Sequence, residues 1–163
     1  MHGLTLQDKY EISEIYAIYA RAIDEKRYDL LAEVFAPDAS LHYEVGPHQF
    51  DCSGKQAKEH FSAFLNLCYW TNHLIGTPMI EQIKNVFATA RVTATHLQKD
   101  GLGNLHRWIL RGSYHDVFIQ QGSRWKIARR VCICTDSEGE FLSDGAVEFS
   151  SMSWADPALI SND

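Results

Sequence analysis

The feature that most constrains the fold is a run from Asn85 to Gln98 in which small apolar and polar side chains alternate. Its apolar positions are Val86, Ala88, Ala90, Val92 and Ala94, and its polar positions include Thr89, Arg91, Thr93 and Thr95. A period of two is typical of a β-strand with one buried face. A strand this long is expected to twist and coil. The run therefore predicts a strongly curved sheet.

Two more strands are expected to follow this run. The segment Lys99–Asn104 has the composition of a turn and leads into a strand over about 105–120. A second turn at 121–123 leads into a last strand over 124–134. Consecutive strands joined by short turns favour an antiparallel meander.

Three helices are expected before the long strands, because apolar residues recur at helical spacing over 5–24, 28–35 and 53–67. A strand over 39–44 lies between the second and third helices. We predict an α+β domain over residues 1–135, in which a strongly curved antiparallel sheet wraps around three N-terminal helices. Residues 136–163 are expected to form a tail that packs on the pocket mouth or on a neighbouring subunit.

Composition excludes some classes of function. The 163 residues carry a formal net charge of −6, which gives no electrostatic footprint for nucleic acid. No apolar run has the length of a membrane span, and the first residues do not resemble a signal peptide, so we expect a cytoplasmic protein without a membrane partner. The four cysteines show no metal-binding spacing, and we predict neither a metal nor a cofactor.

Asp24 and His73 are the first candidates for chemistry. Asp24 ends the first predicted helix, and His73 begins the later apolar segment Thr71–Gly76. A carboxylate that holds a histidine in one tautomer makes a general base. Each residue also has a structural interpretation, Asp24 as a solvated acid and His73 as a core histidine. A pocket at the mouth of a curled sheet would allow the two to meet.

The chain resembles the SnoaL-like branch of the NTF2-like superfamily from about Leu6 to Cys134. The resemblance is carried by Tyr19–Asp24, Tyr28–Ala39 and Arg124–Ile127. It implies a cone-shaped barrel. It leaves the function open, because the superfamily includes dehydratases, isomerases, cyclases and non-catalytic modules.

Scytalone dehydratases, within this branch, have active-site residues at the positions of Asp24, Tyr43, His73 and His96. The related hexachlorocyclohexane dehydrochlorinases share the Asp and the His and add an arginine at the position of Arg130. By this resemblance, the first four are candidate catalytic residues. Arg130 is a candidate for binding a developing anion, with a salt bridge, for example to Asp24, as the structural alternative.

Other positions differ from both relatives. Scytalone dehydratases have a tyrosine at the position of Ile23 and an asparagine at that of Tyr114, and the dehydrochlorinases have a lysine at that of Tyr19. These three positions, together with Trp108, are expected to line the substrate pocket. The differences imply a substrate distinct from those of both relatives.

The resemblance favours a cofactor-independent lyase of the dehydratase type that abstracts a proton next to a carbonyl of a small cyclic or polyketide-like substrate. An isomerase or a polyketide cyclase would use the same base. A non-catalytic ligand-binding or assembly module is the alternative outside enzymes. We expect a homo-oligomer, with a trimer favoured over a dimer, because an open sheet face needs covering.

Overall fold

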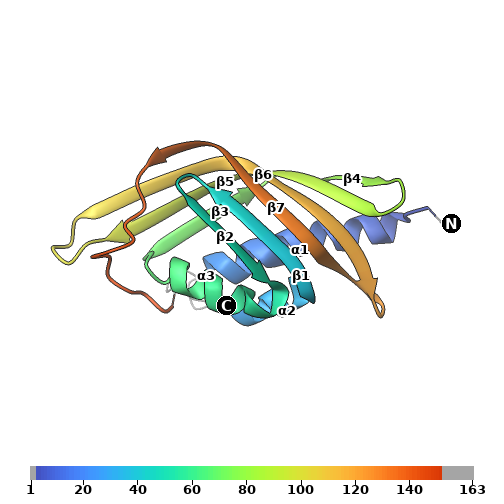
Figure 1. The fold of residues 1–163 in the computed structure, drawn as a ribbon, viewed down its shortest axis with the longest axis horizontal. Coiled ribbons are helices and arrows are strands. Elements are labelled where there is room, and N and C mark those ends of the chain that lie inside the picture. The colour runs from blue at the N-terminus through green and yellow to red at the C-terminus, as the bar shows by residue number, and fades with distance from the viewer. Residues whose placement is uncertain (1–2, 152–163) are drawn as a thin grey trace, which may run out of the picture.

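The computed structural model describes residues 3–151, in which three helices lie under a curved seven-stranded sheet (Figure 1). The helices are α1 (Leu6–Asp24), α2 (Leu31–Val34) and α3 (Ala57–Leu65), and short 3-10 turns, η1 (Tyr28–Leu30) and η2 (Gly54–Gln56), precede α2 and α3. The strands are β1 (Phe35–Val45), β2 (His48–Ser53), β3 (Trp70–Ile75), β4 (Met79–Gln82), β5 (Val86–Lys99), β6 (Leu105–Gln121) and β7 (Arg124–Gly139). The α+β prediction is confirmed.

The strand order is β2-β1-β7-β6-β5-β3, and β4 also pairs with β5. The predicted meander over β5, β6 and β7 is confirmed, since these strands are antiparallel neighbours. The sheet is not antiparallel throughout, because β1 pairs with β7 in parallel. Two parallel neighbouring strands need a long connection between them. Here the connection from β1 to β7 contains β2 to β6 and α3. Strand β3 lies over the apolar segment Thr71–Gly76, whereas β2 and β4 were not predicted because they are too short for a clear alternation.

Local signals explain the start of α1. Thr5 accepts a hydrogen bond from the backbone N–H of Asp8, and the Asp8 carboxylate accepts one from the backbone N–H of Thr5 at 2.8 Å. This reciprocal pair is a capping box, which satisfies two backbone donors at the start of the helix. One face of α1 is buried against the sheet, through Ile12, Ile15, Tyr16, Tyr19, Ala22, Ile23 and Asp24.

Strand β7 runs to Gly139, beyond the predicted end at Cys134. The register between β6 and β7 shifts between Arg111 and Gly112, which marks a bulge. A Cβ on Gly112 would lie 2.1 Å from the carbonyl oxygen of Ile133, so only glycine fits there.

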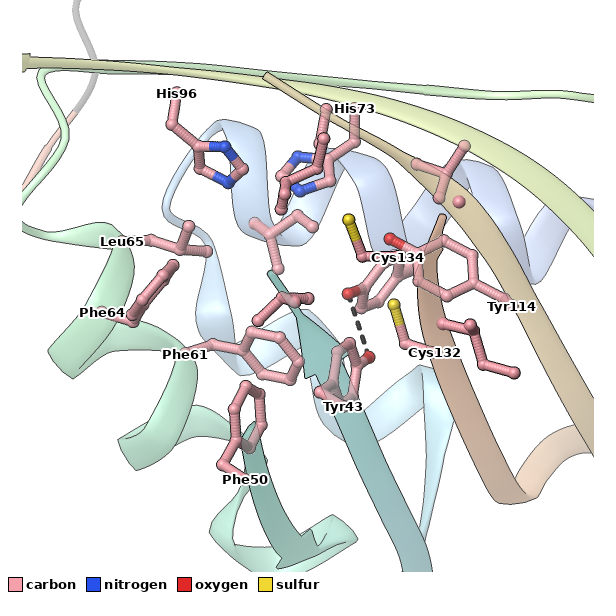
Figure 2. A pocket seen from close by; sticks show the side chains of 18 of the residues that line it. Tyr43, Phe50, Phe61, Phe64, Leu65, His73, His96, Tyr114, Cys132 and Cys134 are labelled. Atoms are coloured by element: carbon pink, nitrogen blue, oxygen red, sulfur yellow. Dashed lines mark hydrogen bonds between the residues drawn. The ribbon is translucent and has the colours of Figure 1, made fainter. Parts of the chain in front are cut away.

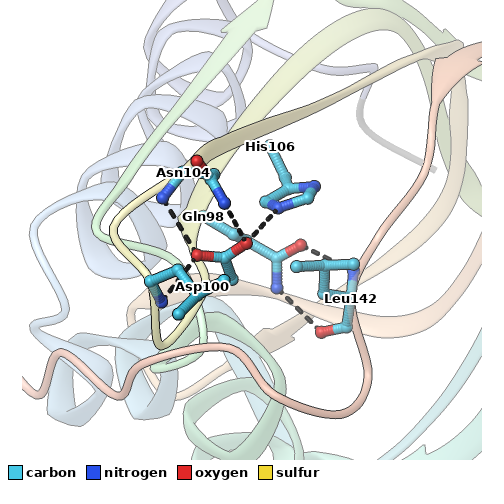
Figure 3. A network of polar contacts seen from close by, with 6 residues as sticks. Gln98, Asp100, Asn104, His106 and Leu142 are labelled. Carbon is cyan, nitrogen blue, oxygen red and sulfur yellow. Dashed lines mark hydrogen bonds and ion pairs between the residues drawn. The ribbon is translucent and has the colours of Figure 1, made fainter.

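The segment after β7 returns across the end of the sheet (Figure 3). The side-chain amide of Gln98 donates to the Leu142 carbonyl at 2.9 Å and accepts from the Leu142 N–H at 2.7 Å. The nearby β5–β6 turn is closed by Asp100, which accepts from Asn104. Of the expected tail of residues 136–163, the part up to residue 151 is an extension of β7 followed by a segment fixed to β5. Residues 152–163 lie outside the described part of the chain.

Within residues 3–151, none of the helices is both long enough and apolar enough to cross a membrane.

Candidate active site

Asp24 and His73 contact each other, as predicted. The Asp24 Oδ1 atom lies 2.7 Å from Nδ1 of His73, within the 2.6–3.2 Å expected of a catalytic hydrogen bond. The other carboxylate oxygen accepts from the backbone N–H of His73 at 2.8 Å, and Thr71 Oγ1 donates to Oδ1 at 2.9 Å. Three donors from β3 therefore fix a carboxylate at the end of α1.

The strand geometry explains this convergence. Thr71 and His73 are two residues apart on β3, so their side chains point to the same face of the strand. That face lies against the end of α1, where Asp24 is only 7% exposed. Burial alone would raise the pKa of the Asp24 carboxyl. The hydrogen bonds and charge of His73, with the help of Thr71, outweigh burial and lower that pKa below its ordinary value.

A pocket opens on the inner side of His73 (Figure 2). His73 and His96 lie along one side of it, and Tyr43, Phe50 and Phe61 lie along the other. The cavity has a volume of about 60 Å³, which is enough for several water molecules. The walls are otherwise mainly apolar: Tyr19, Ile23, Val45, Phe64, Leu65, Val92, Ala94, Leu110, Tyr114, Cys132, Ile133 and Cys134.

The Tyr43 hydroxyl is the polar group opposite the histidines. It lies 3.1 Å from the hydroxyl of Tyr19, and both rings are almost fully buried. Burial raises the pKa of both phenols well above the ordinary value, so both stay protonated and can donate hydrogen bonds. The predicted lining residues Tyr19, Ile23 and Tyr114 are all in the pocket wall.

His96 also lines the pocket, with its ring centre 5.4 Å from that of His73 and the two rings nearly perpendicular. Within the described residues, its Nδ1 atom is buried and has no hydrogen-bond partner. Burial, followed by the nearby charge of His73, lowers the pKa of His96 to about 3. His96 is therefore a neutral imidazole at physiological pH.

Two predicted lining residues lie elsewhere. Trp108 does not line the pocket, because it packs behind His96 with ring centres 5.2 Å apart. Arg130 points inward but is also outside the pocket wall. Its guanidinium is held by the Asp116 carboxylate, at 2.8 Å from Nε and 2.7 Å from Nη2. Arg130 thus forms a salt bridge, as the structural alternative predicted, but its partner is Asp116 and not Asp24.

Several site residues were not found from the sequence. Thr71 stands two positions before His73, and that spacing on a strand was the available signal. Asp116 is opposite Arg130 only because the β6–β7 register shifts between Val117 and Phe118. Within residues 3–151, no three His, Cys, Asp or Glu side chains are grouped to hold a metal ion.

Comparison with known proteins identifies the family of this chain. The model of the SnoaL-like domain matches residues 4–131. An uncharacterised protein of Mycobacterium tuberculosis H37Rv is 28% identical over 127 residues, which cover 77% of this chain and 84% of the relative.

Solved structures of other proteins share this fold. A candidate scytalone dehydratase from Novosphingobium aromaticivorans superposes with a TM-score of 0.69 at 18% identity, over 91% of this chain and 97% of the other. A hexachlorocyclohexane dehydrochlorinase of type 2 superposes with a TM-score of 0.68 at 17% identity, over 88% and 93%. The family match and this shared architecture agree, and the chain belongs to the SnoaL-like branch of the NTF2-like superfamily.

Proposed function

We propose that this protein is a lyase of the dehydratase type, which removes a proton next to a carbonyl of a small cyclic or polyketide-like hydroxy compound. The observation that carries the proposal is the 2.7 Å contact between Asp24 and His73 at the wall of an apolar pocket. The names of the structural neighbours, a candidate scytalone dehydratase and a dehydrochlorinase, support elimination chemistry on this fold.

In the proposed mechanism, the Asp24 carboxylate accepts a hydrogen bond from the Nδ1–H of His73, which holds the tautomer with its lone pair on Nε2. Nε2 takes a proton from the carbon next to the substrate carbonyl. The electron pair of that C–H bond forms an enolate, whose oxygen accepts a hydrogen bond from the Tyr43 hydroxyl. When the enolate collapses, the C–O bond at the β-carbon breaks. The departing hydroxide takes the proton from the His73 imidazolium and leaves as water.

His96 has a supporting role in this proposal. Because its pKa is lowered to about 3, it does not compete with His73 as a proton carrier near neutral pH. Its unpartnered Nδ1 atom can hydrogen-bond to the leaving hydroxyl group from within the pocket.

The test compares Asp24→Asn and His73→Ala with the wild type on a panel of β-hydroxy carbonyl compounds. We expect kcat to fall by about 10²–10⁴ in each variant, the range for loss of a general base. The chain offers a matched control, because His42 and Asp51 form a second pair at 2.7 Å on the exposed edge of the sheet. Asp51→Asn and His42→Ala should leave kcat unchanged. Unchanged turnover in both Asp24→Asn and His73→Ala would rule out the proposed base.

An isomerase or a polyketide cyclase would use the same base, so the Asp24–His73 contact favours them too. The products separate the three reactions: loss of water, movement of a double bond, or formation of a carbon–carbon bond. A binding or assembly module would accept a ligand and return it unchanged in every assay.

We also propose that the chain forms a homo-oligomer, with a trimer favoured over a dimer. Large apolar side chains at Leu74, Phe87, Ile119 and Ile133 on four strands are 37–64% exposed. Such surfaces are commonly covered by a partner. Light scattering during gel filtration should give three times the mass of the chain, and a monomer mass would contradict this expectation.

A further inference from the structure

Among the described residues, a fully buried ion pair lies behind the aromatic wall of the pocket. The side chains of Arg130 and Asp116 are both 0% exposed, and they form a two-pronged ion pair. The guanidinium carbon lies 4.4 Å from the ring centre of Tyr19 and 4.1 Å from that of Tyr114. These two rings line the pocket, and Arg130 does not, so aromatic side chains stand between the cation and the ligand space.

One guanidinium nitrogen of Arg130, Nη1, makes no hydrogen bond to Asp116. This atom points to the Tyr43 oxygen at 3.5 Å, a long contact that suits a weak, polarising interaction. A phenol oxygen that accepts a hydrogen bond from a cation holds its own proton less tightly, and so its O–H is a stronger hydrogen-bond donor. Tyr43 is therefore the pocket residue through which Arg130 can act on a bound molecule by a hydrogen bond.

The remaining charges near the pocket do not offer a free cation. Arg111, at the pocket rim, is paired with Asp136 at 2.6 Å and with Glu138 at 2.9 Å. The charge nearest the histidines is the Asp24 carboxylate. Since the Arg130–Asp116 pair is neutral as a whole, the pocket as described presents no unpaired positive charge to a ligand.

We propose that Asp116 is a positioning residue that fixes substrate class: by neutralising Arg130 and aiming it at Tyr43, it makes the pocket accept an uncharged carbonyl oxygen and reject a carboxylate. Without Asp116, the uncompensated guanidinium would attract anions to the same end of the pocket. This inference rests on the proposed use of the pocket for a carbonyl compound.

The test measures equilibrium binding of two probes of similar size, cyclohexanone and cyclohexanecarboxylate, at a pH above neutrality. The wild type should bind the ketone and bind the carboxylate at least about tenfold more weakly. Asp116→Asn should shift this ratio at least about tenfold toward the carboxylate. Asp51→Asn, which makes the same charge change on the exposed edge, should keep the wild-type ratio. Equal affinity of the wild type for both probes, or an unchanged ratio in Asp116→Asn, would overturn the proposal.

A second measurement decides the outcome if Asp116→Asn does not fold. The double variant Asp116→Asn/Arg130→Gln replaces the ion pair with neutral amide side chains that can hydrogen-bond to each other, so no uncompensated charge is left buried. The infrared C=O stretch of bound cyclohexanone reports the hydrogen bond from Tyr43. It should move to higher frequency in the double variant and in Tyr43→Phe. An unmoved stretch in the double variant would show that Arg130 does not act through Tyr43. Both measurements are free of turnover, so their failure is distinct from failure of the Asp24–His73 mechanism.

Discussion

His73 owes its orientation to one buried carboxylate. Asp24 receives the ring Nδ1 contact, the backbone N–H of His73 and the hydroxyl of Thr71, all within 2.9 Å. The residue types of this pair could be recognised in the sequence, and so could Tyr43. The Asp116 partner of Arg130 could not, because a simple two-residue hairpin would place Asp116 opposite Arg129, and the register shift in β6–β7 changes this.

Loss of the Thr71 hydroxyl should weaken the support of Asp24. In Thr71→Val the carboxylate loses one donor while the shape of the side chain is kept. We expect the free energy of unfolding to fall by about 1–3 kcal/mol, the cost of a hydrogen bond to a charged group. Chemical denaturation measures this change. Ser62→Ala removes a hydroxyl that donates to a backbone carbonyl on exposed α3, and should have a smaller effect.

Asp24 should also make stability depend on acid pH. Its pKa is lowered in the folded state below the ordinary value of an aspartate, so the unfolded chain binds the proton more tightly. The stabilisation is complete above the unfolded pKa and is lost as the pH falls through the lower, folded pKa. The stability difference between wild type and Asp24→Asn should therefore shrink as the pH is lowered below about 4. A difference that grows on acidification would contradict this assignment.

At the scale of elements, the long alternating strand was the most reliable signal. The alternation from Val86 onward fixes β5 and its buried face, and the turns at either end of β6 follow from their residue types. Alternation says nothing about which distant strands pair. The parallel contact of β1 with β7 joins residues more than 80 positions apart, and the local sequence pattern does not indicate it.

The bulge at Gly112 should not tolerate a side chain. In Gly112→Ala the new Cβ would meet the carbonyl of Ile133, so β6 and β7 must separate next to the pocket. We expect a loss of about 1–3 kcal/mol in the free energy of unfolding, the usual cost of overpacking. Gly101→Ala is the control, because nothing lies within 4 Å of its added Cβ. Equal stability of the two variants in thermal denaturation would disprove the constraint.

At the scale of the whole molecule, Lys26 connects three parts of the chain. Its Nζ donates to the carbonyl of Leu65 at the end of α3, to that of Cys68 just after α3, and to that of Phe149 in the returning segment. Lys26 also adopts a positive φ of 54° just after α1. This role could not be predicted from the sequence, because a lysine after a helix is ordinarily solvated.

Removal of Lys26 should release the returning segment. In Lys26→Ala we expect faster amide hydrogen exchange at Phe149, whose N–H donates to Asn66, with little change in the central strands. Arg27→Ala removes a neighbouring side chain that is 54% exposed, and should leave exchange unchanged. Protection at Phe149 that survives in Lys26→Ala would show that the other contacts are sufficient.

The proposed mechanism depends on the orientation of the His73 ring, and nitrogen-detected NMR of the imidazole reports it directly. Two-bond ¹⁵N–¹H correlations at neutral pH identify which ring nitrogen carries the proton. We predict that His73 is protonated at Nδ1 and bare at Nε2 in the wild type, and that Asp24→Asn loses this preference. A wild-type His73 protonated at Nε2 would contradict the mechanism, because no basic nitrogen would then face the pocket.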